Sequence, residues 1–220
     1  MNGYMPSVVY PLPSTVMIIK YLDFLGSFPT YRQCPSDTRP EYAFIGRSNV
    51  GKSSLVNMLC GYKKAAKVSG TPGKTQFINM FLINNEWLLA DLPGYGYARV
   101  SKTKRRQFEQ MIRDYMNFRD TLACVFVLID IRHKPQEIDV EFVNQLGKMR
   151  IPFVLVFTKA DKNKKTPELN VENVEAFKAA LLETWEEVPP CFITSAESGL
   201  GREELHKFIN DINKDWAGQE

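Results

Sequence analysis

The segment Gly46–Ser53 contains the residues whose types and spacing most clearly indicate chemistry. It reads G-R-S-N-V-G-K-S and fits the pattern G-x-x-x-x-G-K-[ST], a glycine-rich loop that surrounds phosphate groups. Such a loop points backbone N–H groups inward, and the helix that follows adds a dipole that favours an anion. The lysine ammonium lies near the β- and γ-phosphates, and the serine hydroxyl is a ligand for Mg²⁺. The members of this candidate phosphate site are Gly46, Arg47, Ser48, Asn49, Val50, Gly51, Lys52 and Ser53.

A second candidate segment is Asp91-Leu92-Pro93-Gly94, which follows an apolar run. An acidic side chain at this point can hold Mg²⁺ through water, because Mg²⁺ keeps part of its hydration shell. A glycine three residues later allows a backbone N–H group to approach the γ-phosphate. The pattern D-x-x-G is weak by itself, but its place after a phosphate-binding loop favours a nucleotide site over an ordinary turn.

A third segment, Thr158–Asp161, is suited to reading a nucleotide base. A carboxylate in the plane of guanine accepts hydrogen bonds from N1–H and from the 2-amino group, whereas adenine offers neither donor there. A buried carboxylate left unpaired should therefore penalise ATP. The stem of Lys159 can pack over the base. Thr158 stands where many GTPases have Asn, which predicts a weaker contact bracing the loop. The candidate base site contains Thr158, Lys159, Ala160 and Asp161, with backbone contacts from Thr194, Ser195 and Ala196.

Between the phosphate loop and Asp91 lies the segment 71–76, T-P-G-K-T-Q. A threonine that ligates Mg²⁺ only when a γ-phosphate is present allows a loop to sense the bound nucleotide. Thr71 and Thr75 both have the required chemistry, and their position in the loop does not decide between them.

Short apolar runs alternate with helix-period stretches, and these elements must position the motifs. We expect strands at Met17–Phe24, Tyr42–Ile45, Phe77–Ile83, Glu86–Ala90, Ala123–Ile129, Phe153–Phe157 and Cys191–Thr194. We expect helices at Ser53–Cys60, Lys102–Arg119 with Ser101 as N-cap, Glu137–Met149, Val171–Glu187 and Arg202–Trp216. Asn84-Asn85 predicts a tight hairpin.

The predicted fold class is α/β, with a mostly parallel sheet, one antiparallel edge pair and helices on both faces, as in a P-loop GTPase or Ras-like G domain. In such sheets ligands bind beyond the carboxyl ends of the strands, where all of these motifs lie.

The composition is typical of a globular chain, with 220 residues, 44% hydrophobic residues and a net charge of +3. We expect one G domain over residues 17–216, with a flexible lead-in at 1–16 and a tail at 217–220. The longest apolar run is only strand-sized, so no membrane association is expected. The four cysteines are far apart, which favours free thiols and a cytoplasmic location. We expect a structural or surface role for His133 and a solvated His206.

Taken together, these segments resemble the EngB family (also called YihA or YsxC), ribosome-biogenesis GTPases of the TRAFAC class. The resemblance covers about Tyr21 to Ile212 and rests on G-R-S-N-V-G-K-S, T-P-G-K-T-Q, D-L-P-G-Y-G-Y-A, I-D-I-R-H and T-K-A-D. It implies a role in late assembly of the large ribosomal subunit, with GTP/GDP and Mg²⁺ as cofactors. It also implies that Ser53 and Thr75 ligate Mg²⁺ beside Asp91. The nucleotide contacts that it adds are Gly73, Lys74, Thr75, Gln76 and Phe77.

GTP hydrolysis needs charge stabilisation on the γ-phosphoryl group and an oriented water molecule. Many GTPases have Gln directly after D-x-x-G, whereas this chain has Tyr95, which predicts slow intrinsic turnover. The missing element could come from the ribosomal particle, or from a K⁺ ion held with the help of Asn49, as in relatives that share this Asn. A loop-bracing role for Asn49 is the alternative. The catalytic candidates are Lys52, Thr75, Gly94 and Asn49.

Three basic clusters favour a partner rich in ribosomal RNA, namely the large ribosomal subunit or its precursor, bound by a monomer. They are Arg99–Arg106, with five basic residues in eight, then Lys162, Lys164 and Lys165, and then Lys63, Lys64 and Lys67. Basic side chains contact phosphate backbones, and Tyr95 and Tyr97 could stack on unpaired bases.

Two alternatives to a GTPase switch stay open at this point. One is another P-loop NTPase or kinase, for which ATP would bind as well as GTP. The other is a binding module with negligible hydrolysis, in which the nucleotide only orders a docking surface.

Overall fold

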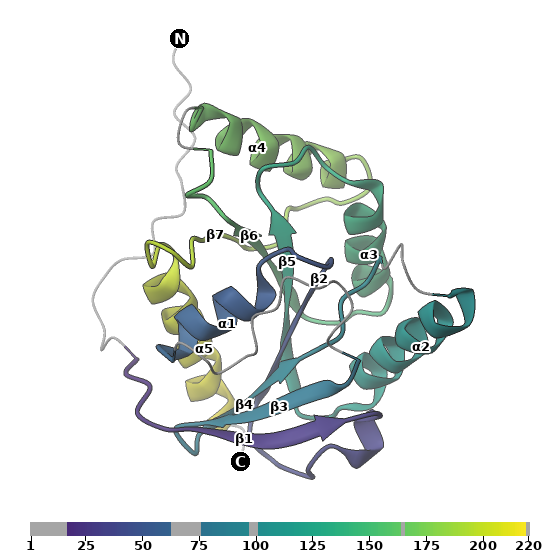
Figure 1. Ribbon diagram of the computed structural model, residues 1–220, viewed down its shortest axis with the longest axis vertical. Helices are drawn as coiled ribbons and strands as arrows, with labels where there is room; N and C mark the ends of the chain where they lie inside the picture. The colour runs from purple at the N-terminus through teal and green to yellow at the C-terminus, as the bar shows by residue number, and fades with distance from the viewer. Residues whose placement is uncertain (1–16, 63–75, 97–100, 164–165, 219–220) are drawn as a thin grey trace.

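A computed structural model describes residues 17–62, 76–96, 101–163 and 166–218, so the expected lead-in 1–16 lies outside the described residues. Its centre is a seven-stranded sheet with the strand order β1-β3-β4-β2-β5-β6-β7 (Figure 1). The strands are β1 (Leu22–Phe28), β2 (Glu41–Gly46), β3 (Ile78–Ile83), β4 (Trp87–Asp91), β5 (Leu122–Asp130), β6 (Phe153–Thr158) and β7 (Cys191–Ile193). The helices are η1 (Tyr31–Gln33), α1 (Lys52–Cys60), α2 (Lys102–Phe118), α3 (Glu137–Lys148), α4 (Glu168–Leu182) and α5 (Arg202–Ala217).

The sheet is parallel through β4, β2, β5, β6 and β7 and antiparallel at the β1 edge. Asn84 and Asn85 form the predicted turn between β3 and β4, with φ of 52° and 59°. Asparagine tolerates this left-handed conformation better than most residues, which suits the tight turn between these strands. The α/β fold with an antiparallel edge is therefore confirmed, and the edge contains one strand more than the hairpin alone, because β1 pairs with β3.

The sequence predicted a first strand that begins at Met17, but β1 begins at Leu22. The preceding residues instead contact the hairpin turn, where the backbone N–H groups of Lys20 and Tyr21 donate to Oδ1 of Asn84 at 2.8 and 3.1 Å. The side-chain oxygen of Asn84 thus accepts hydrogen bonds that the backbone of a neighbouring strand would accept if β1 were longer.

Helices cover both faces of the sheet, as predicted (Figure 1). On one face α2, α3 and α4 bury apolar side chains such as Tyr115, Val143 and Phe177, and on the other α1 and α5 bury Leu55 and Leu205. This arrangement leaves the carboxyl ends of the parallel strands open at one edge of the molecule, where the motifs meet.

The predicted limits of α2, α3 and α5 agree with the structure to within one residue. Ser101 caps α2 as predicted, accepting a hydrogen bond from the N–H of Lys104 at 3.3 Å. Helix α4 was predicted at Val171–Glu187 but begins directly after Pro167 and ends at Leu182. Beyond that end, Trp185 packs its ring edge-on against Phe153, with the centroids 5.7 Å apart. The sequence pattern placed Trp185 inside the helix, whereas in the structure it lies beyond α4 and contacts β6.

The prediction that His206 is solvated was wrong. Its side chain is buried on α5, and Nε2 lies 2.8 Å from the carbonyl oxygen of Leu59 on α1. Burial lowers the pKa of His206 below its ordinary value. His133, in contrast, is exposed, as expected. Among the described residues, no helix combines the length and apolar character needed to cross a membrane.

Candidate nucleotide-binding site

Two glycines shape the loop between β2 and α1. Gly51 has a φ of 105° and caps the N-terminus of α1, a conformation that L side chains rarely adopt. Gly46 ends β2, and a Cβ atom there would lie 2.7 Å from the carbonyl oxygen of Leu128. The first N–H groups of α1 have no acceptor within the helix, and they point into the loop. This loop therefore has the backbone geometry and the helix dipole that bind a phosphate group.

Lys52 and Asp91 meet beside this loop. The ammonium of Lys52 contacts Oδ1 of Asp91, and Nδ2 of Asn79 lies 3.3 Å from Oδ2. Both charged side chains are largely buried, and burial lowers the pKa of Lys52. Ser53 follows Lys52 on α1, so a hydroxyl and a carboxylate lie at the same end of the sheet. Such oxygen donors are the ligands that Mg²⁺ prefers, so Ser53 and Asp91 fit this ion.

A cavity of about 300 Å³ opens beside the phosphate loop, between α1, the T-K-A-D segment and the loop after β7. The carboxylate of Asp161 lies at its wall, where Oδ1 accepts a hydrogen bond of 2.7 Å from the Ser195 hydroxyl. The Nζ atom of Lys162 lies 2.8 Å from Oδ2, but this buried oxygen accepts no hydrogen bond of regular geometry from the described residues.

Burial opposes ionisation of Asp161, but Lys162 and Ser195 outweigh it and lower the pKa of this carboxyl to about 2. Asp161 is therefore an ionised acceptor at the cavity wall, paired with Ser195 and Lys162, and the N–H groups of guanine suit such a carboxylate.

Lys159 connects the cavity with the phosphate loop. Its aliphatic stem passes over Gly51, and a Cβ atom on that glycine would lie 3.5 Å from Cε of Lys159. Its ammonium contacts the carbonyl oxygen of Asn49 and lies 2.8 Å from Oδ2 of Asp130. The stem therefore forms an apolar surface next to the cavity, as expected for a residue that packs over a base.

Asp130 was not predicted as a site residue, although it fixes the Lys159 side chain. Arg132 also holds this carboxylate, with Nε and Nη2 at 2.8 and 2.7 Å. Burial opposes ionisation, but Arg132 and Lys159 lower the pKa of Asp130 to about 2. The signal in the sequence was the position of Asp130 at the carboxyl end of β5, between the strands that carry the two stronger motifs.

Thr158 braces the phosphate loop. Its hydroxyl donates to the carbonyl oxygen of Val50 at 2.6 Å and lies 3.2 Å from that of Ile129. We expected a weaker contact from threonine than from the usual asparagine, but a short hydrogen bond is present. The hydroxyl reaches the loop because β6 ends at Thr158, directly beside β5.

The loop after β7 contributes more than the backbone contacts that the sequence suggested. Thr194 is tied to β6, since its hydroxyl donates to the carbonyl oxygen of Phe157 at 3.0 Å. Ser195 is buried and holds Asp161 with its side chain, a role that the three-residue pattern did not predict. Ala196 lines the cavity.

The Tyr95 side chain packs against α3. It is buried, its ring stacks on Phe142 with the centroids 4.2 Å apart, and its hydroxyl donates to Oδ1 of Asp139 at 2.9 Å. The prediction that Tyr95 could stack on RNA bases is therefore wrong, and Tyr97 lies outside the described residues.

The remaining predicted residues fall into two groups. Leu92, Pro93 and Gly94 are buried beside Asp91, whereas Gln76 and Phe77 are exposed just before β3. Outside the described residues lie Gly73, Lys74 and Thr75, together with Lys63, Lys64, Lys67, Arg99, Lys164 and Lys165 from the basic clusters.

Comparison with known proteins decides the family. A family model described as "50S ribosome-binding GTPase" matches residues 41–159, more than half of the 220 residues. The "Probable GTP-binding protein EngB" of Christiangramia forsetii is 55% identical over 197 residues, which cover 90% of this chain and 98% of that protein. The protein of the same name from Porphyromonas gingivalis is 54% identical over 201 residues, or 91% of this chain and 99% of that protein. The chain belongs to the EngB family of GTP-binding proteins.

Solved structures show the fold of this EngB-family chain. The crystal structure of a probable GTP-binding protein EngB matches with a TM-score of 0.57 and 23% identity, over 80% of this chain and 99% of that one. Era in complex with MgGDPNP and a 16S ribosomal RNA fragment matches with a TM-score of 0.62 and 23% identity, over 77% of this chain and 55% of that one. The resemblance of the sequence to the EngB family is thus confirmed, and the G-domain fold with it.

Proposed function

We propose that this EngB-family protein is a switch that binds GTP and GDP with Mg²⁺, hydrolyses GTP slowly and acts in assembly of the large ribosomal subunit. The observation that carries the nucleotide assignment is the ionised Asp161 carboxylate at the cavity wall, which Ser195 and Lys162 hold in place. Guanine offers two N–H donors in one plane for such a group, and adenine offers neither. Leaving a buried carboxylate unpaired weakens binding, so adenine nucleotides should bind poorly.

The proposed nucleotide site has three parts. The backbone N–H groups of Gly46–Ser53 and the Lys52 ammonium would hold the β- and γ-phosphates. Thr158–Asp161 and Thr194–Ala196 would hold the base, and Gly73–Phe77 and Asp91–Gly94 would respond to the γ-phosphate. Mg²⁺ would be held by Ser53, Thr75 and Asp91, and when bound it neutralises charge on the phosphates.

Slow hydrolysis follows from the position of Tyr95. Its hydroxyl is already bonded to Asp139 and its ring is buried, so this residue has no free polar group with which to orient a water molecule. The groups of this chain that we assign to catalysis are Lys52, Thr75, Gly94 and Asn49, and we infer that the ribosomal particle or a K⁺ ion supplies the rest. A binding module with negligible hydrolysis is the second candidate, because a buried Tyr95 suits it equally well.

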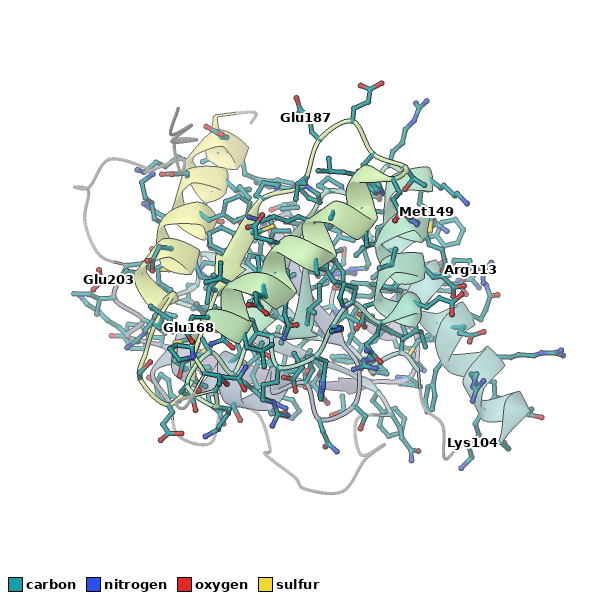
Figure 2. All side chains as sticks on the ribbon, turned by 90° about the horizontal axis from the view of Figure 1, so that it is seen from above. Lys104, Arg113, Met149, Glu168, Glu187 and Glu203 are labelled. Carbon is teal, nitrogen blue, oxygen red and sulfur yellow. The ribbon has the colours of Figure 1, made fainter. Side chains whose placement is uncertain are left out.

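The proposed partner is the large ribosomal subunit or its precursor. The exposed side of α2 supports it, since Lys104, Arg105 and Arg106 lie on the solvent side while Tyr115 packs inward. Figure 2 shows α2 at the edge of the molecule, with Lys104 near its outer end. Cations arranged in this way suit contacts with an RNA backbone. We further propose a monomeric, cytoplasmic protein with a single G domain at residues 17–216, flanked by the lead-in 1–16 and the tail 217–220.

Nucleotide competition tests the assignment. Fluorescent GDP bound to the purified protein with Mg²⁺ is displaced with GDP, GTP, ADP, ATP and XDP. We expect guanine nucleotides to bind about a hundredfold more tightly than adenine nucleotides. Asp161→Asn replaces one acceptor by a donor, and xanthine has a carbonyl where guanine has its amino group, so this variant should prefer XDP.

Asp120→Asn, at an exposed aspartate before β5, is the matched control and should leave the preference unchanged. Equal displacement by ADP and GDP would overturn the guanine assignment. Phosphate release from GTP with and without ribosomal particles then separates the two candidates, because a binding module would release none in either case.

A further inference from the structure

Three segments that are far apart in the sequence meet at one carboxylate, that of Asp139 in the first turn of α3. The Tyr95 hydroxyl donates to Oδ1 at 2.9 Å, and Nε of Arg47 lies 3.4 Å from Oδ2. Arg47 belongs to the phosphate loop, and Tyr95 directly follows Asp91–Gly94. Only 2% of the Asp139 side chain is exposed, so water competes little for either contact.

The main chain joins the same two segments. Arg47 and Tyr95 form a parallel β-bridge outside the strands of the main sheet. The Tyr95 ring also stacks on Phe142, one turn further along α3. Tyr95 is therefore held by its backbone, its ring and its hydroxyl, and two of these three contacts are made with α3.

A buried carboxylate is unfavourable unless it is paired, and Asp139 has several partners. Burial raises the pKa of Asp139, while Arg47 and Tyr95 act in the opposite direction. Its place in the first turn of α3 is favourable for a negative charge, because the N-terminal end of a helix is positive. The contacts of Asp139 thus fix the relative positions of the phosphate loop, the Tyr95 segment and α3.

Gly94 immediately precedes Tyr95, so these contacts also restrict where its N–H group lies. We propose that Asp139 is a positioning residue that prearranges Gly94 for the γ-phosphate of GTP by joining Tyr95 to Arg47. A segment that is already ordered loses less conformational entropy when the nucleotide binds. GDP has no γ-phosphate for Gly94 to contact, so its binding depends less on this order. The inference rests on the proposed function, because it assumes that the site binds GTP.

Two variants weaken the contacts of Asp139 with Tyr95 and Arg47 to different degrees. Tyr95→Phe keeps the ring stack and removes only the hydroxyl contact. Asp139→Asn keeps an acceptor for Tyr95 and removes the charge that faces Arg47. Dissociation constants for GDP and for a non-hydrolysable GTP analogue are measured by displacement of fluorescent GDP, together with the melting temperature. We expect both variants to bind the GTP analogue up to about tenfold more weakly, with a clearly smaller loss of GDP affinity.

Tyr115→Phe is the matched control. Tyr115 is also buried and also donates to a buried carboxylate, that of Glu41, but it joins α2 to β2. Loss of the Tyr115 hydroxyl should lower the melting temperature without changing the ratio of the two dissociation constants. An equal loss of GDP and GTP affinity in the Tyr95 variant, or no change in either, would overturn the proposal. If Asp139→Asn does not fold, Tyr95→Phe alone decides. Wild-type protein that bound no guanine nucleotide would instead contradict the proposed function.

Discussion

The Thr158 hydroxyl donates a hydrogen bond of 2.6 Å to the carbonyl oxygen of Val50, and this bond joins the base-binding segment to the phosphate loop. Thr158 ends β6, whereas Val50 lies just before α1, so the contact links the two halves of the site across the edge of the sheet. Both residues are buried, and removal of the hydroxyl would take this hydrogen bond from the Val50 carbonyl oxygen.

We predict that Thr158→Val, which keeps the shape of the side chain but removes the hydroxyl, weakens GDP binding about tenfold. Faster release should account for most of this loss, because the phosphate loop would be less well braced. Stopped-flow displacement of fluorescent GDP measures the rate. Thr158→Ser retains the hydroxyl and should release GDP almost as slowly as wild type. Equal rates for all three proteins would show that the bond does not support nucleotide binding.

A second prediction concerns K⁺ and Asn49. Asn49 has a left-handed backbone, with φ of 63°, and is exposed in the phosphate loop. If its side chain helps to hold K⁺ beside the phosphates, GTP hydrolysis should be faster in KCl than in NaCl of equal ionic strength. Asn49→Gly keeps this backbone conformation without strain and should abolish the difference. Equal wild-type rates in the two salts would leave Asn49 with a loop-bracing role only.

A third prediction concerns the exposed side of α2. Lys104→Glu with Arg106→Glu should weaken binding to the large ribosomal subunit, and the loss should be greatest at low salt. Each phosphate contact removed should reduce the slope of log affinity against log salt by about 0.7 to 0.9. Sedimentation with subunits at several salt concentrations measures both effects. Lys148→Glu with Arg150→Glu makes the same charge change at the end of α3 and should have little effect. Equal losses in both pairs would indicate a general charge effect and no specific α2 contact.

A fourth prediction concerns His206, whose pKa in the folded protein is lowered from 6.5 by burial. As the pH falls through 6.5, the unfolded chain binds a proton at this residue before the folded protein does. The free energy of unfolding should therefore be fully retained above this pH and fall below it, by at most about 1.4 kcal/mol per pH unit. Urea denaturation between pH 5 and 7.5, roughly the range in which histidine titrates, measures the change.

His206→Gln keeps a donor for the Leu59 carbonyl and should flatten this pH dependence. His133→Gln, at an exposed histidine, should not. The same slope in wild type and in the His206 variant would mean that another group causes it.

Local sequence was sufficient for the phosphate loop and the elements beside it. Gly46, Gly51 and Lys52 predict a loop between a strand and a helix because backbone sterics and phosphate charge leave few alternatives for that spacing. Asn84-Asn85 likewise predicts its hairpin, since few residue pairs accept two successive positive φ angles. Contacts between distant segments were not predictable in this way, and the start of β1, the end of α4 and the burial of His206 were therefore all misplaced.

The sequence by itself determined the motifs, their order along the chain and the side of the sheet on which they lie, because each follows from spacing over a few residues. Only the tertiary structure decided how those motifs support one another. Ser195 holds Asp161, Asp130 holds Lys159, and Asp139 joins Tyr95 to Arg47. In each of these contacts, at least one partner is a polar group that folding removes from water. Such a group must form a hydrogen bond with whichever partner the packed elements place beside it.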